Sequence, residues 1–119
     1  MPWQLRQYLN VYTDFCAEVG EDKELLARID QRLAILKERG NDTREPITKH
    51  LEDGILEVRA KSSQHQARLL FCFQPAKQIV ILLAVLKDQR KLERVVIEEA
   101  KRRRDIVEAR AGFTGGSVH

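Results

Sequence analysis

The chain has 119 residues, enough for one domain with a single hydrophobic core that needs neither disulfides nor metals. Of these residues 43% are hydrophobic and 33% are charged, and no segment approaches the roughly 20 apolar residues that a membrane span requires. The pattern of a secretory signal, a basic start before an apolar stretch and a small-residue cleavage site, is absent, so we expect a cytoplasmic protein.

Charge is unevenly distributed along the chain, whose formal net charge is +3. Residues 1–45 carry seven Lys and Arg against nine Asp and Glu, whereas residues 46–119 carry fourteen against nine. A basic second part favours a polyanionic partner. Cys16 and Cys72 have apolar neighbours and no metal-ligand spacing, so we expect reduced core residues and neither a metal nor a cofactor.

The first 40 residues predict two antiparallel helices. Apolar residues recur at three- and four-residue spacing from Leu5 to Val19, which is typical of one helix face and argues against a short strand within residues 4–10. Asp22 is a suitable N-cap for a second helix that ends near Gly40. The buried face of this second helix would consist of Leu25, Leu26, Ile29, Leu33 and Leu36.

Three strands are predicted after a polar crossing segment, residues 41–48. Residues 55–60 and 67–73 alternate in polarity, as half-buried strands do, and Asp53-Gly54 is a turn signal immediately before the first of them. Residues 79–86 are apolar on both faces, so this third strand should lie inside the sheet.

A C-terminal helix is predicted from about Gln89 to Arg110, capped by Asp88 and packed on the sheet through Leu92, Val95, Val96 and Ala100. Its basic run, residues 101–104, is typical of a solvated face and equally suits a nucleic-acid backbone. The predicted fold class is therefore α+β. It has two N-terminal helices, a small, mainly antiparallel sheet of three to four strands and a C-terminal helix, as one domain at residues 1–111 with a flexible tail at 112–119.

Two arginines stand out on the predicted strands. Alternation places Arg59 on one face with Glu57, and a four-residue turn at 62–65 would bring Arg68 directly opposite Arg59, although loops of other lengths also fit. Two like charges facing each other across a ladder are unfavourable unless an anion such as a phosphate lies between them. The alternative is that both arginines are solvated or paired with Glu57.

Four segments, in order, resemble a known family. Residues 49–59, KHLEDGILEVR, are similar to the K-P-L-G-D-G-L-Y-E-L-R segment of RelE/HigB-type toxins, particularly the phage-derived HigB-like branch of the RelE/ParE superfamily. The later segments QARLLFCF, IVILLAVLKDQ and IEEAKRRRDIVEAR resemble that branch's Y-R-V-L-Y-F strand, I-V-L-L-H-G-F-x-K-K strand end and I-E-x-A-K-R-R helix. The resemblance covers roughly residues 49–110, and its fold, RelE-like, is compatible with the predicted elements.

The resemblance implies the toxin of a toxin–antitoxin pair, which enters the ribosomal A site and cleaves messenger RNA. In such cleavage the nucleotide's own 2′-OH attacks the adjacent phosphate, and basic side chains can orient the RNA and stabilise the charge without a metal. Arg59 and Arg68 match the family's strand arginines, and Lys87 falls near its Lys pair. The implied partners are an antitoxin protein, the ribosome and messenger RNA, with no membrane and no cofactor.

The general base is not given by the motifs. A histidine suits proton transfer near neutral pH, and His65 in the predicted hairpin loop is favoured over His50. Glu57 is a second candidate base, or the arginines' ion-pair partner. The family's second lysine is missing or displaced toward Arg90 or Lys91. The candidate RNA contacts are Lys61, Arg90, Lys91, Lys101 and Arg102.

Two other readings stay open. The incomplete Lys pair and the undefined base favour a non-catalytic relative that binds RNA, the ribosome or a protein. A weaker alternative is a DNA-binding module built on the basic final helix, although no helix-turn-helix is recognisable and the apolar side of that helix is needed by the sheet.

Overall fold

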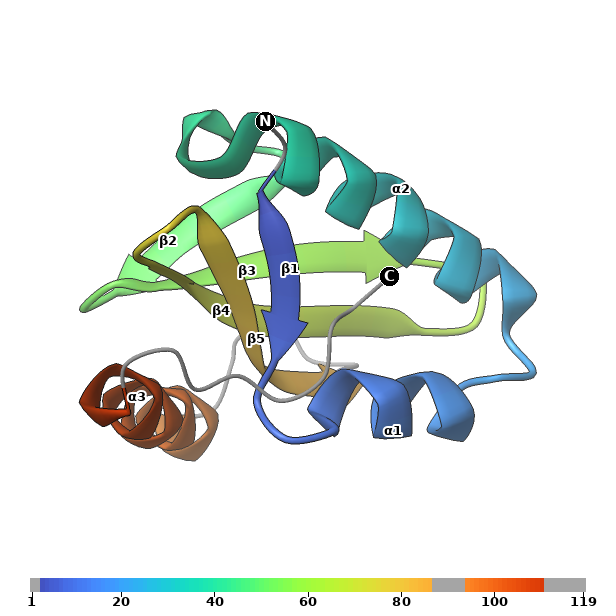
Figure 1. The fold of residues 1–119 in the computed structure, drawn as a ribbon. Helices are drawn as coiled ribbons and strands as arrows, with labels where there is room; N and C mark the ends of the chain where they lie inside the picture. Colours follow the sequence, from blue (N-terminus) through green and yellow to red (C-terminus); the bar gives the residue numbers. More distant parts are fainter. Residues whose placement is uncertain (1–2, 87–93, 111–119) are drawn as a thin grey trace.

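The computed structural model describes residues 3–86 and 94–110, which fold into a sheet with helices on both faces (Figure 1). No helix within these two ranges is long and apolar enough to cross a membrane. In chain order the elements are β1 (Gln4–Gln7), α1 (Val11–Glu18), α2 (Lys23–Arg39), the 3-10 helix η1 (Gly40–Asp42), β2 (Thr48–Glu52), β3 (Ile55–Lys61), β4 (Gln66–Gln74), β5 (Gln78–Leu86) and α3 (Arg94–Ala109).

The sheet has five strands in the order β1-β5-β4-β3-β2. Strand β1 pairs with β5 in parallel, and the other neighbours are antiparallel. The predicted sheet of three to four mainly antiparallel strands was therefore wrong, because the sheet is mixed and has a strand at each edge that the sequence patterns did not reveal. The prediction that residues 79–86 lie inside the sheet is confirmed, since β5 has a neighbour on either side.

Strand β1 replaces the first half of the helix predicted from Leu5 to Val19. Its backbone pairs with β5 from Gln4 to Gln7, and the left-handed backbone of Leu9 (φ +49°) separates it from α1. Leu5 and Tyr12 are both buried in one core, although the first reaches it from a strand and the second from a helix. The spacing of these apolar residues therefore resembled that of a single helix face, although they lie on a strand and a helix.

Strand β2 was missed because its pattern is weak: Lys49 and His50 are both exposed. The turn signal Asp53-Gly54 joins β2 to β3, and both residues have positive φ (+51° and +77°), as a tight hairpin turn requires. The predicted turn is therefore present. It connects two paired strands, whereas the sequence pattern predicted only one strand, after the turn.

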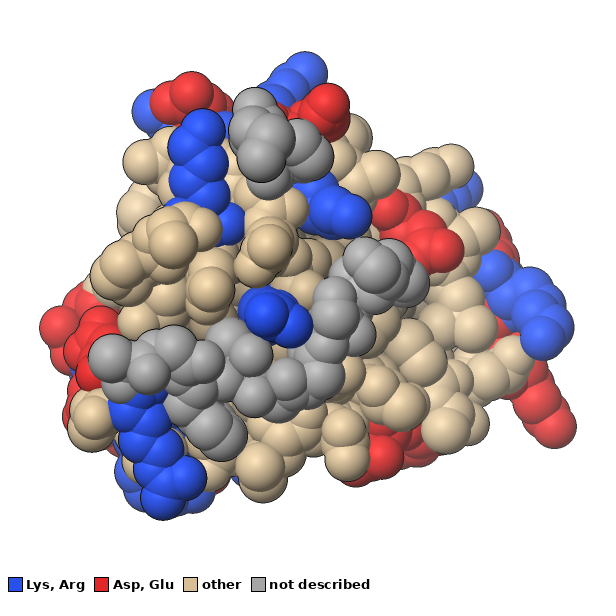
Figure 2. Space-filling view, in the orientation of Figure 1, with Lys and Arg blue, Asp and Glu red and all other residues tan. Residues whose placement is uncertain are grey.

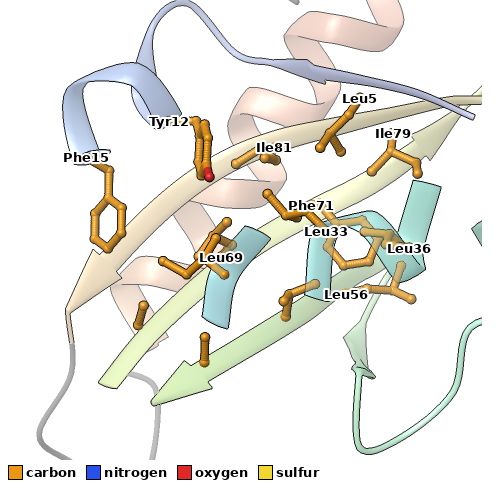
Figure 3. Packing of buried hydrophobic residues seen from close by; sticks show 14 of the residues in the cluster. Leu5, Tyr12, Phe15, Leu33, Leu36, Leu56, Leu69, Phe71, Ile79 and Ile81 are labelled. Atoms are coloured by element: carbon orange, nitrogen blue, oxygen red, sulfur yellow. The ribbon is translucent and has the colours of Figure 1, made fainter. Parts of the chain in front are cut away.

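Each face of the sheet is covered by helices (Figure 1). One face packs on α1 and α2 through a core that includes Leu33, Leu69 and Phe71 (Figure 3). The other face packs on α3, where Ala100 is fully buried as predicted. The prediction for Val95 was wrong, since 66% of this residue is exposed. The predicted cap Asp88 and the position Leu92 lie outside the described residues.

The second predicted helix is confirmed in its bounds and its cap. The Asp22 carboxylate accepts a hydrogen bond from the backbone N–H of Leu25, and Gly40 (φ +57°) ends the helix. Four of the five predicted core positions, at residues 25, 29, 33 and 36, are buried, and Leu26 is partly buried against the same core.

Candidate functional site

Arg59 of β3 and Arg68 of β4 lie directly opposite each other in the sheet. The loop between the strands spans residues 62–65, so the four-residue turn that this register requires is present. On the same face, the rung toward the loop pairs Lys61 with Gln66, and the rung on the other side pairs Glu57 with Leu70. The predicted register is confirmed.

This face of the sheet is the one that α3 covers in part. Ile55 and Leu70 belong to the core cluster that includes Ala100 and Val107 of α3. The arginine pair lies one same-face rung beyond Leu70, toward the loop. The two arginines therefore lie on the side of the sheet away from α1 and α2.

Glu57 joins the two arginines. Its Oε1 lies 3.4 Å from Arg59 Nε, and its Oε2 lies 3.5 Å from Arg68 Nη1. The carboxylate and Arg68 are almost completely buried, with side-chain exposures of 2% and 4%, whereas Arg59 is 42% exposed. The alternative in which both arginines pair with Glu57 is confirmed, and Arg59 is the one that solvent and a ligand can reach.

Two exposed lysines extend this charged face. Lys61 follows Arg59 on the same side of β3, and Lys49 of β2 is the cross-strand partner of Glu57. We call Lys49, Glu57, Arg59, Lys61 and Arg68 the basic sheet face; it holds four cations and one carboxylate. Lys49 was not among the candidates, because the strand that carries it was not predicted.

The basic run of α3 is engaged with carboxylates. Lys and Arg side chains gather over α3 in Figure 2, but many of them are ion-paired. Lys101 pairs with Glu52 of β2 and lies 3.4 Å from Glu98, and Arg102 lies 2.6 Å from Glu99. Hydrogen bonds from Arg94 first, and from Lys101, lower the pKa of Glu52 to about 2, and those from Arg102 first, and from Arg103, lower the pKa of Glu99 to about 2. The two predicted RNA contacts on α3 therefore compete with intramolecular partners.

The other two cations of the run, Arg103 and Arg104, also contact partners within the protein. Arg103 donates to the carbonyl of Leu82 at 2.8 Å and lies over the ring of Tyr8, 5.0 Å from its centroid. Arg104 lies 3.1 Å from the carboxylate of Asp53 in the β2–β3 turn. The run therefore fastens α3 to the sheet, and its partners at residues 52 and 53 were too distant in sequence to be foreseen.

His65 is held by the N-terminus of α2. Its Nδ1 lies 2.7 Å from Asp22 Oδ2, which also accepts a hydrogen bond from Ser62 Oγ at 2.7 Å. These contacts, with Ser62 first, lower the pKa of the Asp22 carboxyl. A cavity of about 340 Å³ adjoins them, lined by the end of α1, residues 20–22, Gln64 and His65. The structure thus places His65 against the N-terminus of α2.

The other candidates are placed as follows. His50 pairs with Leu56, which packs in the α1 and α2 core, so it lies on the face opposite the arginines. Lys87, Arg90 and Lys91 lie outside the described residues. Within the described ranges, no three His, Cys, Asp or Glu side chains gather as a metal ion would require, and Cys16 and Cys72 are free thiols.

Fold and site together define a small α+β protein that carries a partly exposed arginine on a basic sheet face. A family model described as "Phage derived protein Gp49-like (DUF891)" matches residues 20–105, a range that includes Arg59, Arg68 and most of α3. The chain belongs to this family, which is toxin-like and related to RelE and HigB. No match was found among curated proteins.

Proposed function

We propose that this protein is the toxin of a toxin–antitoxin module and acts as a ribosome-dependent messenger-RNA endonuclease. The observation that supports this proposal is the opposed pair of Arg59 and Arg68 on the basic sheet face. The family match supports the toxin–antitoxin context. Messenger RNA and the ribosome would be its substrate and platform in the cytoplasm, and an antitoxin would cover the basic sheet face or prevent entry into the ribosome.

The chemistry follows from the charges. When the 2′-OH of a nucleotide attacks the adjacent phosphate, the pentacoordinate phosphorus gathers negative charge that cations must offset. Arg59 is exposed enough to hold this phosphate, and the positive charge of the buried Arg68 directly opposite would add to the stabilisation without direct contact. Lys61 would hold the RNA backbone, and Lys87 would assist at the phosphate. Arg90, Lys91, Lys101 and Arg102 complete the proposed RNA contacts.

The experiment that tests this function uses a translating extract. The wild-type protein and an Arg59→Ala, Arg68→Ala double variant are added, and primer extension maps the 5′ ends of a messenger RNA. We expect new ends that require both ribosomes and the arginines. Intact messages, with a wild-type protein shown to be folded by circular dichroism, would contradict the proposal.

The proton-transfer role of His65 stays a prediction that the same assay tests. A general acid or base typically contributes a factor of about 10² to 10⁴, so His65→Ala should lower the cleavage rate by about that factor. A lower melting temperature with the cleavage rate retained would assign His65 to its contact with Asp22 alone.

A second candidate function is a non-catalytic relative that binds RNA, the ribosome or a protein. The observation that favours it is the carboxylate of Glu57, which already partners both arginines. Under this alternative, the extract would show intact messages, while the protein would still cosediment with ribosomes or bind RNA.

A further inference from the structure

Glu57 is an unusual neighbour for a phosphate-binding site. It is 2% exposed, and its Oε2 accepts no hydrogen bond from the described residues although it lies 3.5 Å from Arg68 Nη1. Its Oε1 lies 3.4 Å from Arg59 Nε, a distance longer than a good charge-assisted hydrogen bond. The two contacts are similar in length and differ in exposure: the Arg68 side chain is buried beside the carboxylate, whereas solvent and a ligand can reach Arg59.

The register explains why an anion is needed there. Arg59 and Arg68 face each other directly, and two like charges in that position repel. Glu57 is on the same face of β3, two residues from Arg59, and supplies the negative charge in the absence of a ligand. A phosphate group brings the same kind of charge with more acceptor oxygens, so it competes with Glu57 for Arg59.

We propose that Glu57 is an internal counter-anion that occupies Arg59 until a phosphodiester of RNA replaces it there, while Arg68 keeps its contact with Glu57. This inference rests on the proposed function and names Glu57 as a positioning residue of the same site. It divides the work between the arginines: Arg59 exchanges partners, and Arg68 anchors the carboxylate. The isolated protein would bind free RNA weakly, so a substrate already presented by the ribosome would be favoured.

A binding experiment without cleavage tests the exchange. Fluorescence anisotropy with a 2′-O-methyl oligoribonucleotide, which lacks the attacking hydroxyl, compares the wild-type protein with Glu57→Gln. In Glu57→Gln the carboxylate no longer competes with the phosphate for Arg59. A hydrogen bond from a charged group such as Arg59 to the phosphate contributes a factor of about ten or more, so we expect Glu57→Gln to bind about tenfold more tightly. Adding Arg59→Ala to Glu57→Gln should abolish this gain.

The control is Glu38→Gln, which changes the net charge equally at an exposed position of α2, on the opposite side of the sheet. It should leave the affinity within about twofold of wild type, because exposed charges beyond a Debye length of about 10 Å are screened. An equal gain in Glu38→Gln and Glu57→Gln, or no gain in a folded Glu57→Gln protein, would refute the counter-anion.

A second measurement uses the unaltered protein, in case Glu57→Gln does not fold. Proton–nitrogen NMR of the arginine side chains follows Nε–H of Arg59 and of Arg68 while the same oligonucleotide is added. We expect the Arg59 signal to move and the Arg68 signal to stay. Movement of both signals, or of neither at saturation, would refute the exchange.

These readouts separate the inference from the proposed function. Tighter binding by Glu57→Gln together with intact messages in the translating extract would uphold the counter-anion and refute the endonuclease. Cleaved messages without any gain in binding by Glu57→Gln would uphold the endonuclease and refute the counter-anion.

Discussion

The imidazole of His65 lies 2.7 Å from the carboxylate of Asp22, and this contact ties the β3–β4 loop to the first turn of α2. The same carboxylate accepts hydrogen bonds from Ser62 Oγ and from the backbone N–H of Leu25. One side chain therefore caps a helix and also holds a hairpin loop that follows 40 residues later in the chain.

Replacing Asp22 by alanine should lower the melting temperature, because the helix cap and the loop contact are lost together. The hydrogen bonds lower the pKa of Asp22, so the carboxylate stabilises the fold fully above the unfolded-state pKa of about 3.9. This contribution fades as the pH falls through the lower folded-state pKa. Melting curves by circular dichroism at neutral and acid pH should show the difference from wild type shrinking in acid.

The matched control for this change is Asp14→Ala, which removes an exposed carboxylate from the first turn of α1. Its effect should be smaller. Equal losses in the two variants would mean that the Asp22 contacts contribute nothing of their own.

Arg68→Ala should destabilise the fold far more than Arg59→Ala. Removing one partner of a buried ion pair leaves an uncompensated charge and typically costs about 3–5 kcal/mol, which applies to the buried pair of Glu57 and Arg68. Ion pairs with a solvent-exposed member are worth about 1 kcal/mol or less, and this applies to Arg59. Urea unfolding of both variants measures the two losses, and similar values would contradict the buried anchor.

Gly40→Ala should destabilise the protein by about 1–3 kcal/mol, the usual cost of a strained backbone position. Gly40 has φ +57°, and a Cβ built there would lie only 2.0 Å from atoms of the Trp3 ring. Gly20→Ala is the comparison, because its added Cβ would approach nothing closer than 3.3 Å. Unfolding followed by the fluorescence of Trp3, the single tryptophan, measures both variants, and equal losses would contradict the steric argument.

Acid should weaken the attachment of α3. Hydrogen bonds from Arg94 first, and from Lys101, lower the pKa of Glu52 to about 2, below the unfolded value of about 4.3. Their stabilisation is complete above that unfolded value and is lost progressively between about pH 4 and pH 2. Glu52→Gln should therefore lower the melting temperature at neutral pH and cost little near pH 2.

Salt and a second variant make this prediction sharper. Because these charges are partly solvated, added salt should reduce the effect of Glu52→Gln at neutral pH. Glu38→Gln should show neither the pH dependence nor the salt dependence, and the same profile in both variants would exclude a specific role for Glu52.

The sequence predicted those elements whose signals are local. The Asp22 cap, the helix end at Gly40 and the alternation around Arg59 each depend on a few neighbouring residues, and all three were correct. Strand β1 could not be predicted this way, because its partner in the sheet is β5, far along the chain. The helical spacing of apolar residues such as Leu5 and Tyr12 arises because they are buried in one core, although they belong to two elements, β1 and α1.

The site was predictable in part for the same reason. The opposed arginines follow from strand alternation and a four-residue turn, and both are short-range features. The contact of His65 with Asp22, and those of Lys101 and Arg104 with residues 52 and 53, join segments that meet only in the folded chain. Charge counting along the sequence could not show that these cations already have partners.

The parallel pairing of β1 with β5 also fixes an order of events during synthesis. Hairpins β2–β3, β3–β4 and β4–β5 connect neighbouring segments and can form as the chain emerges, whereas Gln4 must wait for Gln78. Until β5 has left the exit tunnel, Leu5 has no strand beside it and the sheet lacks one edge. Completion of the sheet therefore follows the synthesis of β5, and the nascent chain carries an unfinished sheet until then.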